Sequence, residues 1–562
     1  MKTFFNILFC FFLIKASSQG PNLLFSKSIG GVANDNGNAI AVDINNNIYV
    51  AGDFASTVDF DPGPNTASIS CLGQTDLFFA KYDALGNYLW AKGIGANGRE
   101  TVNSIAVDKN GNLYVTGYFE DTTDFNPSLG IANLMAIGSG RDFFFAKYDT
   151  FGNYLWAKNL RNGLSDQGSS LTIDTLGNDY LTGYCSGTPD FDPGPATATL
   201  SSGVFFAKYD SNGNYIWANS LPSNGFHEGK SIKVDITGNV YLTGYYQGIM
   251  DFDPSVATAT INGGNQSIFF AKYDNGGNYV WAKKIGVGGY NYGAEITLDK
   301  NNNIYLIGVF SGTTDFDPSP STSTIISSGL GDMFFAKYNS FGDFVWVKNF
   351  GNSGWEEGYC LAVDENNNIY ISGYFTSTID FDPSTGVSNL VPINGSPEIF
   401  LAKYDASGNY IWANSFGASG NDQGNRITLD KNGNLYLIGI FQQTVDFDPG
   451  AGVTNLTAYV GSPDVFFAKY SSTVSGLHES KNDLLSVSIS PNPNNGNFNL
   501  TIEQELDNGE FILLNALGQK VFKQKINKGS NVFRLNDFRE GIYLYSILRD
   551  NQLVASGKLI MR

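Results

Sequence analysis

The sequence predicts an all-β protein, and three observations lead to that fold class. The AKY triplet recurs at intervals of 61 to 66 residues, starting at Ala80, Ala146, Ala207, Ala271, Ala336, Ala402 and Ala468. Each interval contains four short runs rich in Ile, Val, Tyr, Phe and Trp, separated by turns rich in Gly, Asn and Asp. No run has helical periodicity. Four-stranded units at a fixed spacing are typical of a β-propeller, so we expect one blade per repeat.

The first repeat gives the order of the expected strands. Residues 39–43 (AIAVD) and 47–54 (NIYVAGDF) flank an Asn-rich turn, which is typical of a β-hairpin. Residues 77–83 (LFFAKYD) and 88–95 (YLWAKGIG) flank a second turn of the same kind. A longer loop that contains the sequence DFDPG joins the second strand to the third.

The number of fourth strands predicts how the ring closes. The tryptophan of that strand occurs in six repeats, as Trp90, Trp156, Trp217, Trp281, Trp346 and Trp412. The seventh repeat stops after residues 466–472, but residues 23–30 (LLFSKSIG) match residues 88–95. Because an unpaired strand edge is a liability, we expect the N-terminal strand to complete the last of seven blades.

The two ends of the chain predict its domain organisation. An apolar run from Phe4 to Ile14, preceded by a lysine and followed by small residues, predicts a secretory signal peptide at 1–18 that is too short to stay in a membrane. We then expect a seven-bladed β-propeller at 19–472, a polar linker at 473–483, and a small Ig-like β-sandwich at 484–562. No other stretch has the length of a membrane helix, so the mature protein is not expected to span a membrane.

Two sets of motifs resemble known families. Residues 107–117 (VDKNGNLYVTG) and 78–90 (FFAKYDALGNYLW) resemble SBBP-type β-propeller repeats. Segments of the last domain resemble the C-terminal sorting domain of type IX secretion substrates of Bacteroidota, namely residues 488–502, 513–522, 535–547 and 557–562. This resemblance implies Sec export to the periplasm, passage through the type IX secretion machinery, and a final location at the outer cell surface or outside the cell. An independent binding role of an Ig-like domain is the alternative.

Composition excludes several classes of function. The formal net charge is −19, so a nucleic acid is an unfavourable partner. The chain contains two histidines, His227 and His478, which leaves no Ser/His/Asp or Cys/His set and no zinc motif. No cofactor is therefore expected, apart from the calcium alternative below. Paired carboxylates at the central funnel leave one enzyme class open, a hydrolase or lyase that acts on polysaccharides.

The DFDPG motif has near-copies that start at Asp59, Asp124, Asp190, Asp251, Asp315, Asp380 and Asp446. A catalytic pair is needed once, so seven copies favour turn chemistry. We expect Asp59 to accept backbone N–H bonds that orient the loop, and Asp61 to cap the turn. Calcium is the alternative, with Asp59, Asp61, Asp190 and Asp192 as ligands, although Asn126 replaces the second aspartate in the second copy.

Three arginines lie on or between the long loops around the second repeat: Arg99, Arg141 and Arg161. One interpretation is a small anion-binding patch for a carboxylate or sulfate of a sugar. The other is that they are solvated side chains without a common role.

Aromatic residues on the segments between repeats are the other binding candidates. Tyr290, Tyr292 and Trp355 could stack on a carbohydrate, or they could pack between neighbouring blades. The sequence therefore favours a secreted or surface-displayed scaffold that binds a protein, glycan or surface polymer through its loop-rich face. A structural adhesion or surface-layer component is a further hypothesis.

Overall fold

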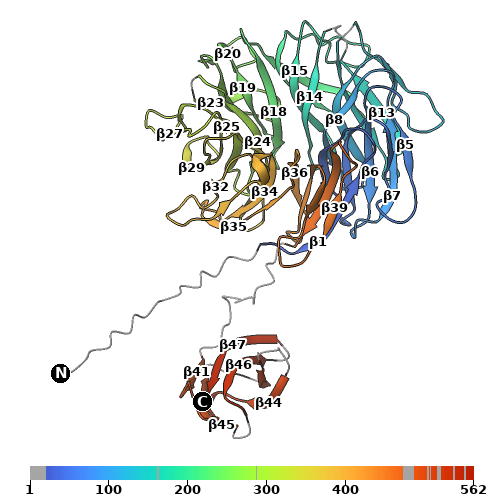
Figure 1. Cartoon of the computed structure of the whole chain (residues 1–562). Coiled ribbons are helices and arrows are strands. Elements are labelled where there is room, and N and C mark those ends of the chain that lie inside the picture. The colour runs from blue at the N-terminus through green and yellow to red at the C-terminus, as the bar shows by residue number, and fades with distance from the viewer. Residues whose placement is uncertain are drawn as a thin grey trace. The chain divides into compact units, whose positions relative to one another are not determined.

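The computed structural model describes residues 20–138, 140–160, 164–286, 288–471, 487–502, 506, 508–515, 520–535, 538–549 and 552–562. The chain divides into two compact units, unit 1 (Met1–Val474) and unit 2 (Ser475–Arg562), which are described separately (Figure 1). The expected signal peptide (1–18) and linker (473–483) lie outside the described residues.

Within the described residues, unit 1 contains seven four-stranded antiparallel sheets, which we number in chain order. Their first strands are β2 (Asp35–Val42), β8 (Glu100–Val107), β14 (Gln167–Ile173), β18 (His227–Val234), β24 (Tyr292–Leu298), β30 (Glu356–Val363) and β36 (Gln423–Leu429). Each first strand contacts the first strand of the next sheet, and β36 contacts β2. The first strands therefore lie side by side around the middle of unit 1.

The remaining strands follow the order expected from the repeats. The second strands are β3 (Ile48–Phe54), β9 (Leu113–Phe119), β15 (Asp179–Cys185), β19 (Val240–Tyr246), β25 (Ile304–Phe310), β31 (Ile369–Phe375) and β37 (Leu435–Phe441). The third strands are β6 (Asp76–Tyr82), β12 (Asp142–Tyr148), β16 (Gly203–Tyr209), β22 (Ser267–Tyr273), β28 (Asp332–Tyr338), β34 (Glu398–Tyr404) and β40 (Asp464–Tyr470). The fourth strands of sheets 1 to 6 are β7 (Tyr88–Ile94), β13 (Tyr154–Asn159), β17 (Tyr215–Leu221), β23 (Tyr279–Ile285), β29 (Phe344–Phe350) and β35 (Tyr410–Phe416).

The N-terminal strand completes sheet 7. Strand β1 (Leu23–Ile29) pairs antiparallel with β40, giving the order β1-β40-β37-β36. Phe467 of sheet 7 also packs against Tyr82 of sheet 1, with ring centroids 4.6 Å apart. The same Phe–Tyr contact joins sheets 1 and 2, where Phe79 lies 4.4 Å from Tyr148. The predicted pairing of the two ends of the repeat region is confirmed.

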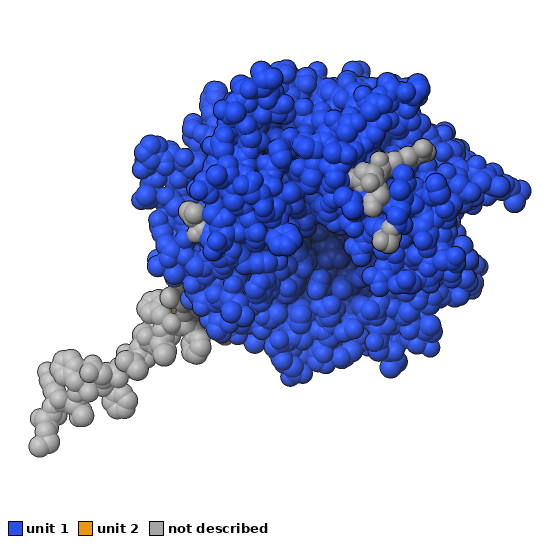
Figure 2. All heavy atoms as spheres, turned by 90° about the horizontal axis from the view of Figure 1, so that it is seen from above, with its two compact units in different colours: residues 1–474 blue, residues 475–562 orange. Residues whose placement is uncertain are grey.

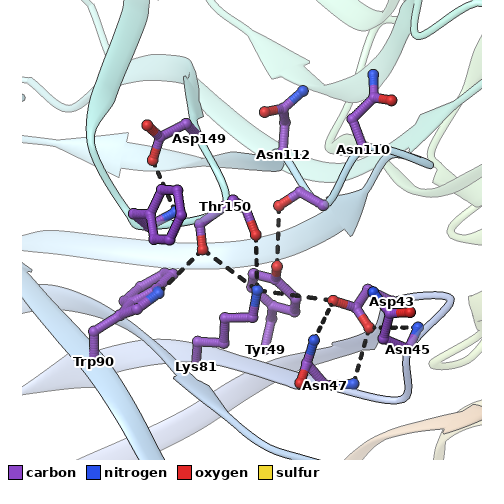
Figure 3. A network of polar contacts seen from close by, with 12 residues as sticks. Asp43, Asn45, Asn47, Tyr49, Lys81, Trp90, Asn110, Asn112, Asp149 and Thr150 are labelled. Atoms are coloured by element: carbon purple, nitrogen blue, oxygen red, sulfur yellow. Dashed lines mark hydrogen bonds and ion pairs between the residues drawn. The ribbon is translucent and has the colours of Figure 1, made fainter.

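The hairpins of neighbouring sheets are joined by a polar network. Lys81 Nζ donates to Thr150 Oγ1 at 2.8 Å and lies 4.7 Å from the centre of the Tyr49 ring. Trp90 Nε1 donates to the Thr150 carbonyl at 3.2 Å, and the Tyr49 hydroxyl donates to the Gly111 carbonyl at 3.0 Å (Figure 3). These bonds run from sheet 1 to the turns of sheet 2. The lysine–tyrosine contact recurs in the other sheets, as Lys147–Tyr114, Lys208–Tyr180, Lys272–Tyr241, Lys337–Tyr305, Lys403–Tyr370 and Lys469–Tyr436.

The DFDPG loops are held by the expected turn bonds. Asp59 Oδ1 accepts the N–H groups of Asp61 at 3.1 Å and Ala67 at 2.8 Å, and Asp61 Oδ1 accepts the N–H of Gly63 at 2.8 Å. The two bonds to the first aspartate recur in the other six copies. Phe60 is buried in the core. The predicted roles of Asp59 and Asp61 are confirmed.

Most of these loops contain a short two-stranded hairpin. The pairs are β4 (Thr57–Asp59) with β5 (Ser68–Ser70), β10 (Thr122–Asp124) with β11 (Asn133–Met135), β20 (Ile249–Asp251) with β21 (Thr260–Asn262), β26 (Thr313–Asp315) with β27 (Thr324–Ile326), β32 (Ile379–Asp380) with β33 (Asn389–Leu390), and β38 (Thr444–Asp446) with β39 (Asn455–Thr457). A 3₁₀ turn, η1 (Ile393–Gly395), follows β33. Gly30 forms a bridge with Asp59. We call this side of unit 1, with the DFDPG loops and the segments between sheets, the loop face.

Buried carboxylates hold the segments between sheets at the loop face. Asp35 accepts the N–H of Gly31 at 2.8 Å, and Asp422 accepts the N–H of Ala418 at 2.8 Å. Burial raises the pKa of Asp35 to about 7 and that of Asp422 to about 6. At the equivalent position of sheet 2, burial raises the pKa of Glu100 to about 8.

These carboxyl groups predict that unit 1 loses stability between pH 5 and pH 8. A folded-state pKa above the unfolded value means that the folded protein binds protons more tightly, so the stabilisation is full below about pH 4 and is lost as the pH rises through 6 to 8. Urea unfolding should therefore show a lower midpoint at pH 8 than at pH 5. The Glu100→Gln variant should depend less on pH, and a midpoint that rises toward pH 8 would contradict the prediction.

In its described residues, unit 2 has two sheets that share one core. One sheet has the order β41 (Val487–Ser490), β42 (Asn497–Ile502), β45 (Gly529–Arg534), and the other has the order β44 (Lys520–Ile526), β43 (Gly509–Leu514), β46 (Gly541–Arg549), β47 (Gln552–Met561). The ring centres of Phe533, from the first sheet, and Phe511, from the second, lie 4.5 Å apart in the core that the two sheets share.

Candidate ligand-binding site in the central cavity

A cavity of about 700 Å³ lies between the first strands of unit 1 (Figure 2). Every first strand contains a β-bulge near its start, as between Gly37 and Ala39 of β2. Because of the extra residue in the bulge, the side chains before and after Gly37 point to the same side of the strand. Asn36 and Asn38 accordingly both donate a hydrogen bond to the carboxylate of Asp53. These two positions line the cavity in most sheets, so each repeat contributes to one central site.

Four sheets form a wall of the cavity that carries amides and small polar groups. We call it the amide wall, and its residues from the first strands are Asn36, Asn38, Asn103, Gln167, Ser169, Gln423 and Asn425. Sheets 4 to 6 differ from this pattern at the same positions, with Glu228, Lys230, Tyr292, Glu357 and Tyr359. The cavity therefore has two chemically different walls although the repeats that form it are similar.

The second wall, which we call the aromatic wall, contains Tyr290 and Tyr292, two of the three aromatic residues predicted from the sequence, and Trp355 packs against Tyr290 without lining the cavity itself. The ring of Tyr290 lies 5.2 Å from that of Trp355 and 5.6 Å from that of Tyr292. Tyr359 and Tyr374 form a further pair at 5.6 Å. Tyr290 is 46% exposed, whereas Tyr292 is buried. A ligand can thus reach the Tyr290 ring, and Tyr292 supports it from behind.

Two of the acidic side chains in and below the cavity are paired with cations. Glu228 Oε2 lies 3.0 Å from Lys230 Nζ and accepts a bond from Ser169 Oγ through its other oxygen. Glu295 Oε1 lies 3.0 Å from Arg426 Nη1, which crosses from sheet 7 to sheet 5. Glu357 instead accepts a hydrogen bond from the Trp355 indole N–H at 2.5 Å.

The tyrosines of the aromatic wall remain protonated donors at neutral pH. Burial, followed by the charge of Glu357, raises the pKa of Tyr292, Tyr359 and Tyr374 well above the usual range. Burial and then the charge of Glu228 raise the pKa of Tyr245 to about 12. The hydroxyl groups can therefore donate hydrogen bonds to these carboxylates or to a ligand.

Of the predicted arginines that the structure describes, Arg99 and Arg141 are not part of the cavity lining. Arg99 Nε donates to Gln74 Oε1 at 2.9 Å. Arg141 Nε lies 3.4 Å from Glu120 Oε1. The Cζ atom of its guanidinium group lies 4.4 Å from the centre of the Tyr118 ring. Arg161 lies outside the described residues. An anion patch at these arginines stays a hypothesis, with the charge of Arg141 already paired.

Within the part of the chain that the structure describes, no group of three or more His, Cys, Asp or Glu side chains is arranged to hold a metal ion. The calcium alternative at the DFDPG aspartates stays a hypothesis. Sequence reasoning also missed Glu228, Glu357 and Arg426. The signal that could have found Glu228 and Glu357 is their place directly before a first-strand glycine, where other repeats carry Asn, Gln or Tyr. Arg426 lies two residues after that glycine, where sheets 2 to 4 carry Ser.

Family models match two parts of the chain. Residues 25–53, 89–118 and 411–439 match a β-propeller repeat, and residues 488–562 match a secretion system C-terminal sorting domain. The chain is a β-propeller repeat protein with a C-terminal sorting domain. Both resemblances predicted from the sequence are thereby confirmed. The sorting domain indicates export to the cell surface or into the medium by the type IX machinery. In the described part of this propeller protein, no helix is long and apolar enough to cross a membrane.

Curated relatives of this β-propeller protein are distant. An uncharacterized WD repeat-containing protein of Acanthamoeba polyphaga mimivirus is 26% identical over 545 residues, which cover 82% of this chain and 39% of the relative. The regulatory protein FlaEY of Caulobacter vibrioides is 23% identical over 216 residues, covering 37% of this chain and 22% of the relative. The chain thus spans less than half the length of both relatives.

Among solved structures, a fungal alcohol oxidase in complex with copper is similar to this chain, with a TM-score of 0.34. The two sequences are 11% identical, and the alignment covers 97% of this chain and 98% of that chain. Likeness at this level assigns no activity.

Proposed function

We propose that this protein is an exported seven-bladed β-propeller scaffold with an Ig-like sorting domain, and that it binds a glycan in its central cavity. Seven four-stranded sheets, with β1 paired to β40, support the closed propeller. The two sheets of unit 2 around one core support the Ig-like sandwich. Glycan binding is supported by the cavity itself, which combines exposed aromatic rings with a wall of amides.

Both walls match the chemistry of a sugar ring. The apolar C–H face of a sugar packs on an aromatic ring such as Tyr290, which is accessible and backed by Trp355. Sugar hydroxyls both donate and accept hydrogen bonds, and so do the side-chain amides of the opposite wall. A cavity of about 700 Å³ is in the range of sites that enclose a small ligand or a short oligosaccharide segment.

The expected result is that removing the aromatic wall abolishes glycan binding. On a glycan array, the mature protein should bind a set of glycans, and the Tyr290→Ala/Trp355→Ala variant should bind them at least about tenfold more weakly, because ring contacts contribute about 1 kcal/mol each. The matched control is Phe341→Ala, which removes an exposed aromatic side chain far from the cavity lining. Equal losses in both variants would contradict the assignment.

A second candidate function is a hydrolase or lyase that acts on the same polysaccharide. It is favoured by the presence of two carboxylates, Glu228 and Glu357, in one cavity. Burial is the largest cause that raises the pKa of Tyr290, and the charges of Glu357 and Glu228 raise it further. Assays of released reducing ends and of unsaturated products on array-positive polymers separate the two functions. If the unmodified protein turns over such a polymer and Glu228→Gln does not, the protein is an enzyme and the assignment as a binding scaffold is wrong. Binding to no glycan would favour a protein partner or a structural adhesion or surface-layer role.

A further inference from the structure

Glu357 differs from the other acidic side chains at the cavity because its charge has no cationic partner. Lys230 neutralises Glu228, and Arg426 together with Lys233 neutralises Glu295. Among the residues that the structure describes, neither a lysine nor an arginine forms an ion pair with Glu357. The aromatic wall thus contains one half-buried carboxylate whose hydrogen-bond partners are neutral, namely the Trp355 indole and tyrosine hydroxyls, so its negative charge is not neutralised.

The surroundings of Glu357 strengthen the preference for a positive charge. The Trp355 indole N–H fixes the carboxylate at 2.5 Å, and the ring of Tyr290 lies 5.2 Å from the Trp355 ring. The faces of these aromatic rings carry the negative end of the ring quadrupole and attract cations. A carboxylate at the edge of one of these rings therefore favours an ammonium group over a neutral or anionic group.

A carboxylate without a cationic partner occurs at this position in one sheet, because Glu228, its equivalent in sheet 4, is paired with Lys230. The residue equivalent to Glu357 is Gln167 in sheet 3 and Gln423 in sheet 7, each directly before the glycine of its first strand. Both are neutral amides that also line the cavity. The Glu357→Gln substitution therefore gives sheet 6 a residue that the same position already accepts elsewhere, and the fold should tolerate it.

We propose that Glu357, Trp355 and Tyr290 form a subsite for a protonated amine carried by an amino sugar. The inference rests on the proposed function, because it names the class of glycan that the cavity takes. The carboxylate accepts charge-assisted hydrogen bonds from the ammonium group, and the rings contact its positive charge. The amide wall, with Asn38 and Asn425, offers side-chain carbonyl oxygens to the sugar hydroxyls, which a lysine side chain lacks.

Titration calorimetry on the mature full-length protein tests this subsite with two probes, a β-linked glucosamine tetramer and its fully N-acetylated counterpart. Acetylation removes the positive charge and keeps the sugar rings. At mildly acidic pH, the glucosamine tetramer should bind about tenfold more tightly than the acetylated one. In Glu357→Gln the affinity for the glucosamine tetramer should fall by about tenfold, and the ratio of the two affinities should approach one.

The matched control is Glu365→Gln, which makes the same change at an exposed turn of the same sheet and should preserve the tenfold preference. Equal affinity of the unmodified protein for both tetramers would overturn the amine subsite and leave glycan binding intact. Equal losses for both tetramers in Glu357→Gln would also overturn it. Tighter binding of tetralysine than of the glucosamine tetramer would overturn the sugar assignment. Binding of neither tetramer, with a negative array, would contradict the proposed function itself.

Discussion

Replacing Asp179 with leucine is expected to stabilise unit 1 by about 2 kcal/mol, because a buried polar group without a hydrogen bond is costly. Asp179 is 2% exposed, and its Oδ1 has no hydrogen-bond partner. Burial raises its pKa well above the usual range of a carboxyl group. The other six sheets carry an apolar residue at this position: Ile48, Leu113, Val240, Ile304, Ile369 and Leu435.

Urea unfolding at neutral pH measures this effect. The midpoint should rise in Asp179→Leu and change less in Asp179→Asn, which removes the titratable group but keeps a buried polar group. The reverse substitution, Leu113→Asp, places a carboxyl at the equivalent position of sheet 2 and should destabilise the protein. A lower midpoint for Asp179→Leu would show that the carboxyl has a favourable role that its surroundings do not reveal.

Removing the guanidinium group of Arg426 is expected to destabilise unit 1 by about 3 kcal/mol, since it leaves a buried carboxylate short of its main partner. Glu295 is 4% exposed, and its other oxygen accepts the N–H of Leu361 at 3.0 Å. Lys233 lies 3.7 Å away and is more exposed, so it compensates in part.

The repeat itself suggests how to recover this loss. Where sheet 5 has Glu295, sheet 4 has Ser231, whose Oγ accepts the N–H of Ile296 at 3.3 Å. The double variant Glu295→Ser/Arg426→Ala should therefore keep the bond to the next sheet without a buried charge, and it should regain most of the stability lost in Arg426→Ala. A double-mutant cycle by urea unfolding checks this. Strictly additive losses would contradict the coupling of the two residues.

The sequence was sufficient for the repeat unit and for the pairing of its ends. The match of residues 23–30 to residues 88–95 predicted the β1–β40 pairing, because a strand that lacks its neighbour in the repeat must find it elsewhere. The bonds of Asp59 and Asp61 were predictable because they are local, spanning two to eight residues. The predicted grouping of Arg99, Arg141 and Arg161 relied on distance along the chain, which says nothing about partners such as Glu120.

The β strands, the turns and the number of repeats could be predicted from the sequence, because strand periodicity, turn residues and loop bonds act over short distances along the chain. Which residues meet at the centre could not be predicted in this way. Glu228, Tyr290 and Glu357 come from different repeats and line one cavity because the first strands of all sheets lie side by side around it. The charge balance of that cavity likewise depends on Arg426 reaching Glu295 two sheets away. Such contacts depend on the packing of whole sheets, so a single repeat does not encode them.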